Sequence, residues 1–216
     1  MRSRLGGIWF SAADTNPATT AFANTRPRSG DAQPYTPDLA VGFSRMITDR
    51  VRDGWSCSLV TFMFNRIPGN TQAVLSRMRD EIQRVYCKLV TRVHRKPRTA
   101  APGCLPLFLC CGDIGAADDH LNGGLHFHAL VHLPPLSRLN EPLPDHLTRH
   151  DRLYAGADTL IKRVHAVAVT HDHAYVFDYA FKAIKKGRLS YEDAVLILPR
   201  AKSEVGGALS PQALRA

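Results

Sequence analysis

Two histidines in the middle of the chain have the spacing of a metal site on a β-strand. The segment Gly123–Pro135 reads GGLHFHALVHLPP and places His126 and His128 two residues apart. Because alternate residues of a strand point to the same face, the two imidazoles would project side by side, and apolar residues such as Phe127 would fill the opposite face. Such a strand can hold a divalent metal ion from a rigid backbone. His132 has the same parity but would lie about 20 Å from His126, so we expect it to be structural or to face DNA.

A second segment, residues 174–186, combines phenol and ammonium groups at helical spacing. Tyr175 and Tyr179 lie four residues apart, and Lys182 and Lys186 follow three and seven residues after Tyr179. On a helix all four share one face. A nearby cation favours the phenolate form of a tyrosine, so Tyr179 beside Lys182 has the makings of an activated nucleophile, and the cation could contact a phosphate under attack. The alternative interpretation is an amphipathic helix with ordinary Tyr and Lys residues at its edge.

The order and spacing of the two segments resemble the HUH endonuclease superfamily, which includes rolling-circle replication initiators, conjugative relaxases and single-tyrosine transposases. The family's paired histidines flank a hydrophobic residue, here Phe127, and its Tyr-x-x-Lys motif matches Tyr179 and Lys182. Both segments look most similar to the replication-initiator form. Some members carry a second tyrosine four residues after the first. Here Ala183 holds that position, which indicates a one-tyrosine enzyme.

The resemblance covers about residues 55–190, most loosely at residues 58–64, where Thr61 matches a threonine-containing strand motif of the family. It implies a central antiparallel sheet of the RRM or palm type. It also implies a nuclease that nicks single-stranded DNA through a 5′-phosphotyrosine, with Tyr179 as nucleophile and Lys182 beside it. Further DNA contacts are expected from Thr61, Tyr175, Lys185 and Lys186.

The resemblance also implies that His126 and His128 bind Mg²⁺ or Mn²⁺ with help from an acidic or polar residue near the preceding strand. We expect Asp113 to be this third ligand. Asp118, Asp119 and His120, in the following loop, are the alternatives. The metal ion would polarise the scissile phosphate and neutralise developing charge. The remaining histidines are expected at the surface or in the core rather than as ligands: 94, 146, 150, 165, 171 and 173.

Composition supports a protein that binds a polyanion. The formal net charge is +9 and the pI is about 9.6, which favours nucleic acid over an anionic membrane. No apolar run is long enough for a membrane span, and the N-terminus lacks the apolar core of a secretory signal. Five cysteines without CxxC spacing indicate reduced thiols. We therefore expect a bacterial cytoplasmic protein that acts on single-stranded or hairpin DNA at an origin. It has no phosphate-binding loop of its own, so unwinding would need a host helicase.

The elements that would position these residues alternate along the chain. A helix is expected over 37–53, a strand over 55–64, a long helix over 71–95 and a strand over 105–114, followed by the histidine strand. A short helix within 145–154, a strand over 163–170, a helix over 173–187 and a possible helix over 191–198 complete the order. This order predicts an α+β fold with an antiparallel sheet covered by helices on one face. The predicted nuclease domain is 37–200, between a flexible arm (1–36) and a flexible tail (201–216).

Three other functions remain open on the sequence. A transposase or a mobilisation relaxase would use the same chemistry for another purpose. A histidine-triad nucleotide hydrolase also uses alternating histidines, but it needs a third one where Leu130 stands. A basic DNA-binding module without chemistry would have its histidines merely packed.

Overall fold

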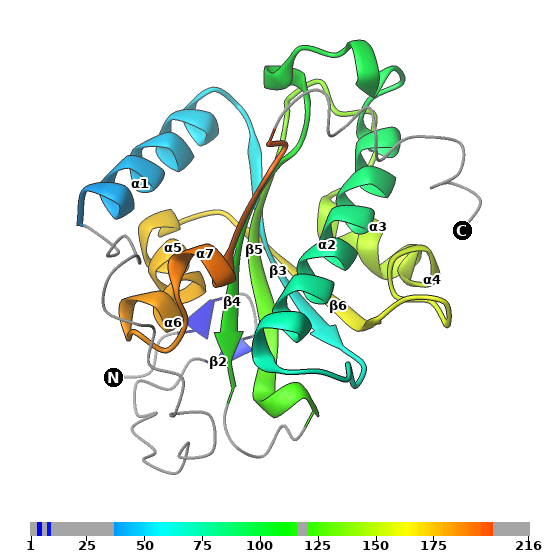
Figure 1. Cartoon of the computed structure of the whole chain (residues 1–216). Coiled ribbons are helices and arrows are strands. Elements are labelled where there is room, and N and C mark those ends of the chain that lie inside the picture. Colours follow the sequence, from blue (N-terminus) through cyan, green and yellow to red (C-terminus); the bar gives the residue numbers. More distant parts are fainter. Residues whose placement is uncertain (1–3, 6–7, 10–36, 116–120, 201–216) are drawn as a thin grey trace.

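A five-stranded antiparallel sheet forms the centre of the protein, in the order β6–β3–β5–β4–β7. This computed structural model describes residues 4–5, 8–9, 37–115 and 121–200. The strands are β3 (Ser56–Phe64), β4 (Leu107–Ile114), β5 (Leu125–Leu133), β6 (Ile161–Val169) and β7 (Val195–Leu198). The predicted α+β class with a central antiparallel sheet is confirmed, and the histidine strand, β5, lies in the middle of the sheet (Figure 1).

The helices cover both faces of the sheet, whereas the sequence analysis placed them on one face. Figure 1 shows α2 (Thr71–Val93), α3 (Leu143–Arg149) and α4 (Asp151–Tyr154) on one side. On the other side lie α1 (Pro37–Arg52), α5 (His173–Ala180), α6 (Lys182–Lys185) and α7 (Tyr191–Ala194). The physical reason is that the inner strands are apolar in both parities, so both of their faces must be buried.

Two hydrophobic cores result, one on each face of the sheet. Phe127, Ala129 and Val131 of β5 pack into the core that α2 covers. Leu130, of the opposite parity, packs with Phe177 and other residues of the second core, which α1 and α5 cover. The even-numbered residues of β5, which include His126 and His128, therefore share the face of α5.

The long helix α2 begins and is buried as its sequence predicts. Asn70 caps it, because its side-chain oxygen accepts a hydrogen bond of 2.9 Å from the backbone N–H of Ala73. Apolar residues at spacings of three and four, from Val74 to Val93, are buried against the sheet. Short 3₁₀ turns follow at Pro97–Thr99 and Pro102–Cys104. Residues Leu121–Gly124 form a turn into β5 in which Asn122 and Gly123 are left-handed.

The predicted helix over 173–187 is interrupted at Phe181, whose backbone leaves the helical range (φ −101°, ψ 12°). Phe181 is fully buried and stacks on Phe177, with ring centroids 4.4 Å apart. Tyr179 therefore belongs to α5 and Lys182 to α6. The predicted C-terminal end of this helical segment at Gly187 is confirmed, because Gly187 adopts a left-handed conformation (φ 63°) that terminates it.

The possible helix over 191–198 is only half helical. Residues 191–194 form α7, and residues 195–198 form β7, which pairs with β4. β4 would otherwise be an edge strand with unpaired backbone groups, and this pairing overrides the weak helical pattern.

The predicted arm and tail fall almost wholly outside the described residues. Within the arm, only β1 (Arg4–Leu5) and β2 (Ile8–Trp9) are described, as an antiparallel pair. None of the helices among the described residues combines the length and apolar character that a bilayer crossing requires.

Candidate metal centre

The register of β4 against β5 brings Asp113 to the paired histidines. Asp113 lies directly opposite His126, and His128 follows two residues along β5 on the same face. The Oδ2 atom of Asp113 is 3.5 Å from His126 Nε2 and 3.4 Å from His128 Nε2. The two Nε2 atoms are 3.1 Å apart. These three residues therefore form a possible metal-binding group, with three ligand atoms converging from two adjacent strands.

The spacing of the three ligand atoms fits a metal ion. Neighbouring ligands of an octahedral ion with bonds of about 2.1 Å lie about 3.0 Å apart, close to the separations found here. Asp113 is fully buried, and its Oδ2 atom has no hydrogen-bond partner in good geometry. A buried carboxylate oxygen in this condition is costly unless a cation lies beside it, and Lys182 Nζ, 3.0 Å away, already provides one positive charge.

Contacts made by the Nδ1 atoms orient the two imidazoles so that both Nε2 atoms can act as ligands. His126 Nδ1 lies 2.9 Å from the carbonyl oxygen of Gly124, which can only accept, so Nδ1 carries the proton and Nε2 presents its lone pair. His128 Nδ1 lies 3.1 Å from the hydroxyl of Thr61, on the neighbouring strand β3. That hydroxyl can donate or accept, so His128 Nε2 can also present a lone pair to a metal.

The electrostatics of the group favour the forms that bind metal. Burial alone would raise the pKa of Asp113, but contact with His128 and the charge of Lys182 outweigh it and lower the pKa to about 2. Asp113 is therefore ionised at neutral pH. Burial lowers the pKa of His128, although its contact with Asp113 opposes the shift. His128 is therefore neutral, which is the form that binds a metal.

Tyr179 and Lys182 lie directly at this group. The ring centroids of Tyr179 and His128 are 5.0 Å apart. Lys182 Nζ is 4.5 Å from the centroid of the Tyr179 ring and 3.0 Å from Asp113 Oδ2. The candidate nucleophile, the cation and the metal-binding group thus meet at one place, although they come from α5, α6 and two strands.

Lys182 favours the phenolate form of Tyr179, as the sequence predicts, but burial opposes it. Burial raises the pKa of Tyr179, and the charge of Lys182 only partly offsets this shift. Tyr179 is half-buried, and the loss of hydration disfavours its anion more than one shared cation favours it. Tyr179 therefore rests as a protonated phenol.

The other residues named from the sequence are divided between the site and its surroundings. Thr61 contacts His128 and belongs to the site by position. Tyr175 and Lys186 are exposed, and Lys185 forms an ion pair of 2.8 Å with Asp178.

His132 is structural rather than exposed to a ligand. It is fully buried, with its Nε2 atom 3.6 Å from the Cys57 thiol. The alternative third ligands, Asp118, Asp119 and His120, lie outside the described residues.

Sequence reasoning missed Gly124 as a positioning residue. Its carbonyl oxygen accepts from both the Gly115 backbone N–H (2.8 Å) and the His126 ring. Its φ of 78° is one that other residues rarely adopt, and a Cβ here would lie 3.2 Å from the Gly115 backbone. The Gly123-Gly124 pair before the strand was the available signal.

No family model, no curated protein and no solved structure matches this chain significantly.

Proposed function

We propose that this protein is a metal-dependent endonuclease that nicks single-stranded DNA through a covalent tyrosine intermediate. We further propose that it starts rolling-circle replication of a plasmid or phage in the bacterial cytoplasm. The observation that carries the nuclease proposal is the contact of Tyr179 with His128, one of three converging metal-ligand candidates. The replication part rests on the resemblance of the two sequence segments to the initiators.

The proposed reaction transfers the 5′-phosphoryl end of the cut DNA strand from the 3′-oxygen to the protein. The Oη atom of Tyr179 attacks the phosphorus, an O–P bond forms to the tyrosine, and the bond from phosphorus to the 3′-oxygen breaks. The phenol proton passes to solvent water, and the 3′-oxygen takes up a proton from solvent to become a free hydroxyl. The DNA 5′ end remains as a phosphotyrosine, so reversal of the step can rejoin strands without ATP.

Lys182 suits two parts of this step. Its ammonium lies over the face of the Tyr179 ring and stabilises negative charge on the phenol as the proton departs. The same group can contact a phosphate oxygen, because an ammonium has three donors and the contact to Asp113 uses only one direction.

Mg²⁺ or Mn²⁺ would be held by Asp113, His126 and His128, which offer one carboxylate oxygen and two imidazole nitrogens. Such an ion supplies Lewis-acid polarisation of the phosphate and neutralises charge in the transition state. The mixed donor set suits Mn²⁺ well and accepts Mg²⁺, which prefers oxygen ligands.

The position of Leu130 argues against the histidine-triad alternative. Leu130 holds the place of the third histidine and is buried in the core on the His128 face. It therefore leaves no third imidazole on β5 next to His128.

A denaturation-resistant adduct tests the proposal. The protein is incubated with Mn²⁺ and a random single-stranded DNA library that is labelled at the 5′ end in one sample and at the 3′ end in another. Covalent complexes are then separated after SDS treatment. The wild type should retain the 3′-labelled fragments, and Tyr179→Phe should retain none. Tyr175→Phe, one turn earlier on α5, is the matched control and should still form the covalent adduct, because its expected DNA contact forms no bond to phosphorus. An adduct that survives Tyr179→Phe would refute the nucleophile, and binding of the library without any adduct would favour the DNA-binding module.

A further inference from the structure

A second group of metal-ligating side chains lies on the opposite face of the sheet. Glu141, His146 and His150 each offer one ligand atom, and the three atoms lie within 4.8 Å of one another. They come from the segment before α3 and from α3 and its C-terminal cap. Leu143 and Leu147 of α3 pack into the core that α2 covers, whereas His128 faces the other side. This group is therefore separate from the candidate metal centre.

The helix places the two imidazoles on one face. His146 and His150 are four residues apart, so they lie on successive turns, and their ring centroids are 4.7 Å apart. The same i, i+4 spacing carries two zinc ligands in helices of the H-E-x-x-H type. Here the intervening residues are Leu, Thr and Arg, so the general base of a metalloprotease is missing. The spacing of the two histidines is visible in the sequence. Glu141 lies outside the helix, and only the folded structure shows that it lies beside them.

Both distances from the carboxylate to the imidazoles are compatible with a tetrahedral ion, and all three ligand atoms lie within 4.8 Å of one another. Glu141 Oε1 lies 3.1 Å from His146 Nδ1 and 4.0 Å from His150 Nε2. Ligands of a tetrahedral zinc ion with bonds of 2.0–2.1 Å are about 3.3 Å apart, between these two values. The longer separation is too great for a hydrogen bond, so His150 Nε2 and Glu141 Oε1 do not bond directly.

Outer contacts orient these ligands as they do in known metal sites. His146 Nε2 lies 2.9 Å from the hydroxyl of Tyr154, which is fully buried, and this contact leaves Nδ1 facing Glu141. Arg149 lies 2.9 Å from the other carboxylate oxygen, Glu141 Oε2, so Oε1 remains for a metal ion. Hydrogen bonds on the far side of ligating residues fix their orientation and raise their affinity.

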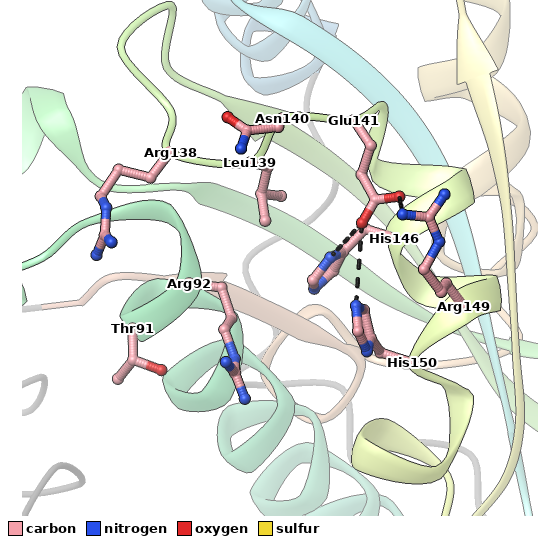
Figure 2. A pocket seen from close by; sticks show the side chains of 9 residues that line it. All are labelled: Thr91, Arg92, Arg138, Leu139, Asn140, Glu141, His146, Arg149 and His150. Carbon is pink, nitrogen blue, oxygen red and sulfur yellow. Dashed lines mark hydrogen bonds and ion pairs between the residues drawn. The ribbon is translucent and has the colours of Figure 1, made fainter.

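An open cavity adjoins the three ligand atoms. It has a volume of about 380 Å³, and Arg92 of α2 and Arg138 line it together with the three ligands. Figure 2 shows Glu141 between His146, His150 and Arg149, with Arg92 and Arg138 on other parts of the cavity wall. A bound divalent ion and two guanidinium groups would together make this cavity strongly positive, which favours an oxyanion.

We propose that Glu141, His146 and His150 bind a zinc-class divalent ion whose open coordination position takes a phosphate-type oxyanion from the adjoining cavity. Three protein ligands with an exchangeable fourth are typical of zinc sites that act on ligands rather than merely stabilise a fold. Arg92 and Arg138 bind the oxyanion beside the metal. This site does not depend on the proposed nuclease function.

Metal titration of matched variants tests the site. Asp113→Asn in every protein weakens the first centre, and Cys104→Ser removes the exposed thiol. Zn²⁺ affinity is measured by competition with a chromophoric chelator. His150→Ala should weaken binding by at least about 100-fold, since loss of outer contacts alone costs 10–100-fold. His150 is about half exposed, with 48% of its side chain accessible, so the variant should fold normally, which circular dichroism checks. His171→Ala, another exposed histidine, is the control and should bind as the background does. Equal affinities of the two variants would overturn the metal site.

Cobalt spectra test the open position. Co²⁺ bound to the background protein should give the visible bands of a four-coordinate ion, and inorganic phosphate should shift them. Arg138→Gln should weaken the phosphate effect at least about tenfold while Co²⁺ affinity stays within about twofold, because the guanidinium contacts the anion and not the metal. A parallel titration with a deoxynucleoside monophosphate distinguishes a free phosphate from a nucleotide as the source of the oxyanion. Bands that neither anion moves would overturn the anion part of the proposal.

Discussion

The ammonium nitrogen of Lys182 lies 3.0 Å from Asp113 Oδ2, the oxygen that also faces both metal-ligand candidates on β5. This ammonium places a positive charge beside the oxygen that a divalent ion would also contact. Lys182 and a metal ion therefore compete for the same oxygen, and they repel each other when both are present.

Lys182→Met should strengthen Mn²⁺ binding. The substitution keeps the length of the side chain and removes its charge, and a partly exposed ion pair is worth about 1 kcal/mol, which corresponds to roughly fivefold in affinity. The same variant should lose most of its DNA-nicking activity, because no cation remains over Tyr179. Calorimetric titration with Mn²⁺ measures the first effect. Lys186→Met, an exposed lysine on the same segment, is the control for the metal effect and should leave Mn²⁺ affinity unchanged. Weaker Mn²⁺ binding by Lys182→Met would contradict the competition.

Asp113→Asn should destabilise the metal-free protein at neutral pH. The pKa of Asp113 is about 2 in the folded protein against 3.8 in the unfolded chain, so the folded state favours the ionised form. Such a group stabilises the fold above pH 3.8, and the stabilisation, about 2 kcal/mol, is lost as the pH falls through 2. Urea unfolding at pH 7 and at pH 3 should show a difference between wild type and variant that shrinks with acidification. A constant difference would show that Asp113 does not act through its charge.

His132→Leu should make folding less sensitive to acid. Burial lowers the pKa of His132 from 6.5 to about 4, so the unfolded chain takes up this proton more readily than the folded protein. The wild type is therefore fully stable with respect to His132 above pH 6.5 and loses roughly 3 kcal/mol as the pH falls towards 4. The variant lacks this loss and removes a buried Nδ1 atom that has no hydrogen-bond partner. Parallel plots of unfolding free energy against pH for the two proteins would contradict the assignment.

Gly124→Ala should damage the metal centre as well as the fold. A Cβ at this position meets the Gly115 backbone at 3.2 Å and also requires a strained φ, so we expect a cost of about 2–3 kcal/mol and displacement of the carbonyl that holds His126. Gly187→Ala separates the backbone strain from the steric clash. Gly187 has a similar φ of 63°, but a Cβ added there would meet no atom within 4 Å. That variant should lose about 1 kcal/mol and keep full Mn²⁺ affinity. Thermal unfolding and Mn²⁺ titration of both variants measure the difference.

Much of the fold could be predicted from local pattern. The bounds of α1, α2 and β3 follow from caps, apolar periodicity and the Gly54 and Pro68–Asn70 boundaries, and they agree with the structure to within a few residues. The helices on both faces and the strand β7 were not predicted. Both depend on which strands become neighbours, and strand order is a property of the whole sheet rather than of any short segment.

Part of the candidate site could also be predicted from the sequence. The His126–His128 pair follows from strand parity. Asp113 is predicted near the pair because it ends the preceding strand, and the register places it opposite His126. The break at Phe181 and the raised pKa of Tyr179 could not be predicted, because both arise from burial against the second core. The clustering of Glu141, His146 and His150 was not predicted, because the carboxylate lies outside the helix that carries the two imidazoles.

The central place of β5 bears on how the candidate ligands move. β5 has strands bonded along both edges and helices over both faces, so its amide protons can reach solvent only when the domain opens as a whole. Fraying and local breathing, which loosen sites built on loops, should leave His128 in register. His126 lies just beyond the β3 pairing and is held by β4 and by the Gly124 carbonyl. An incoming ion therefore finds its two imidazoles already held in place, and little conformational entropy is lost when it binds.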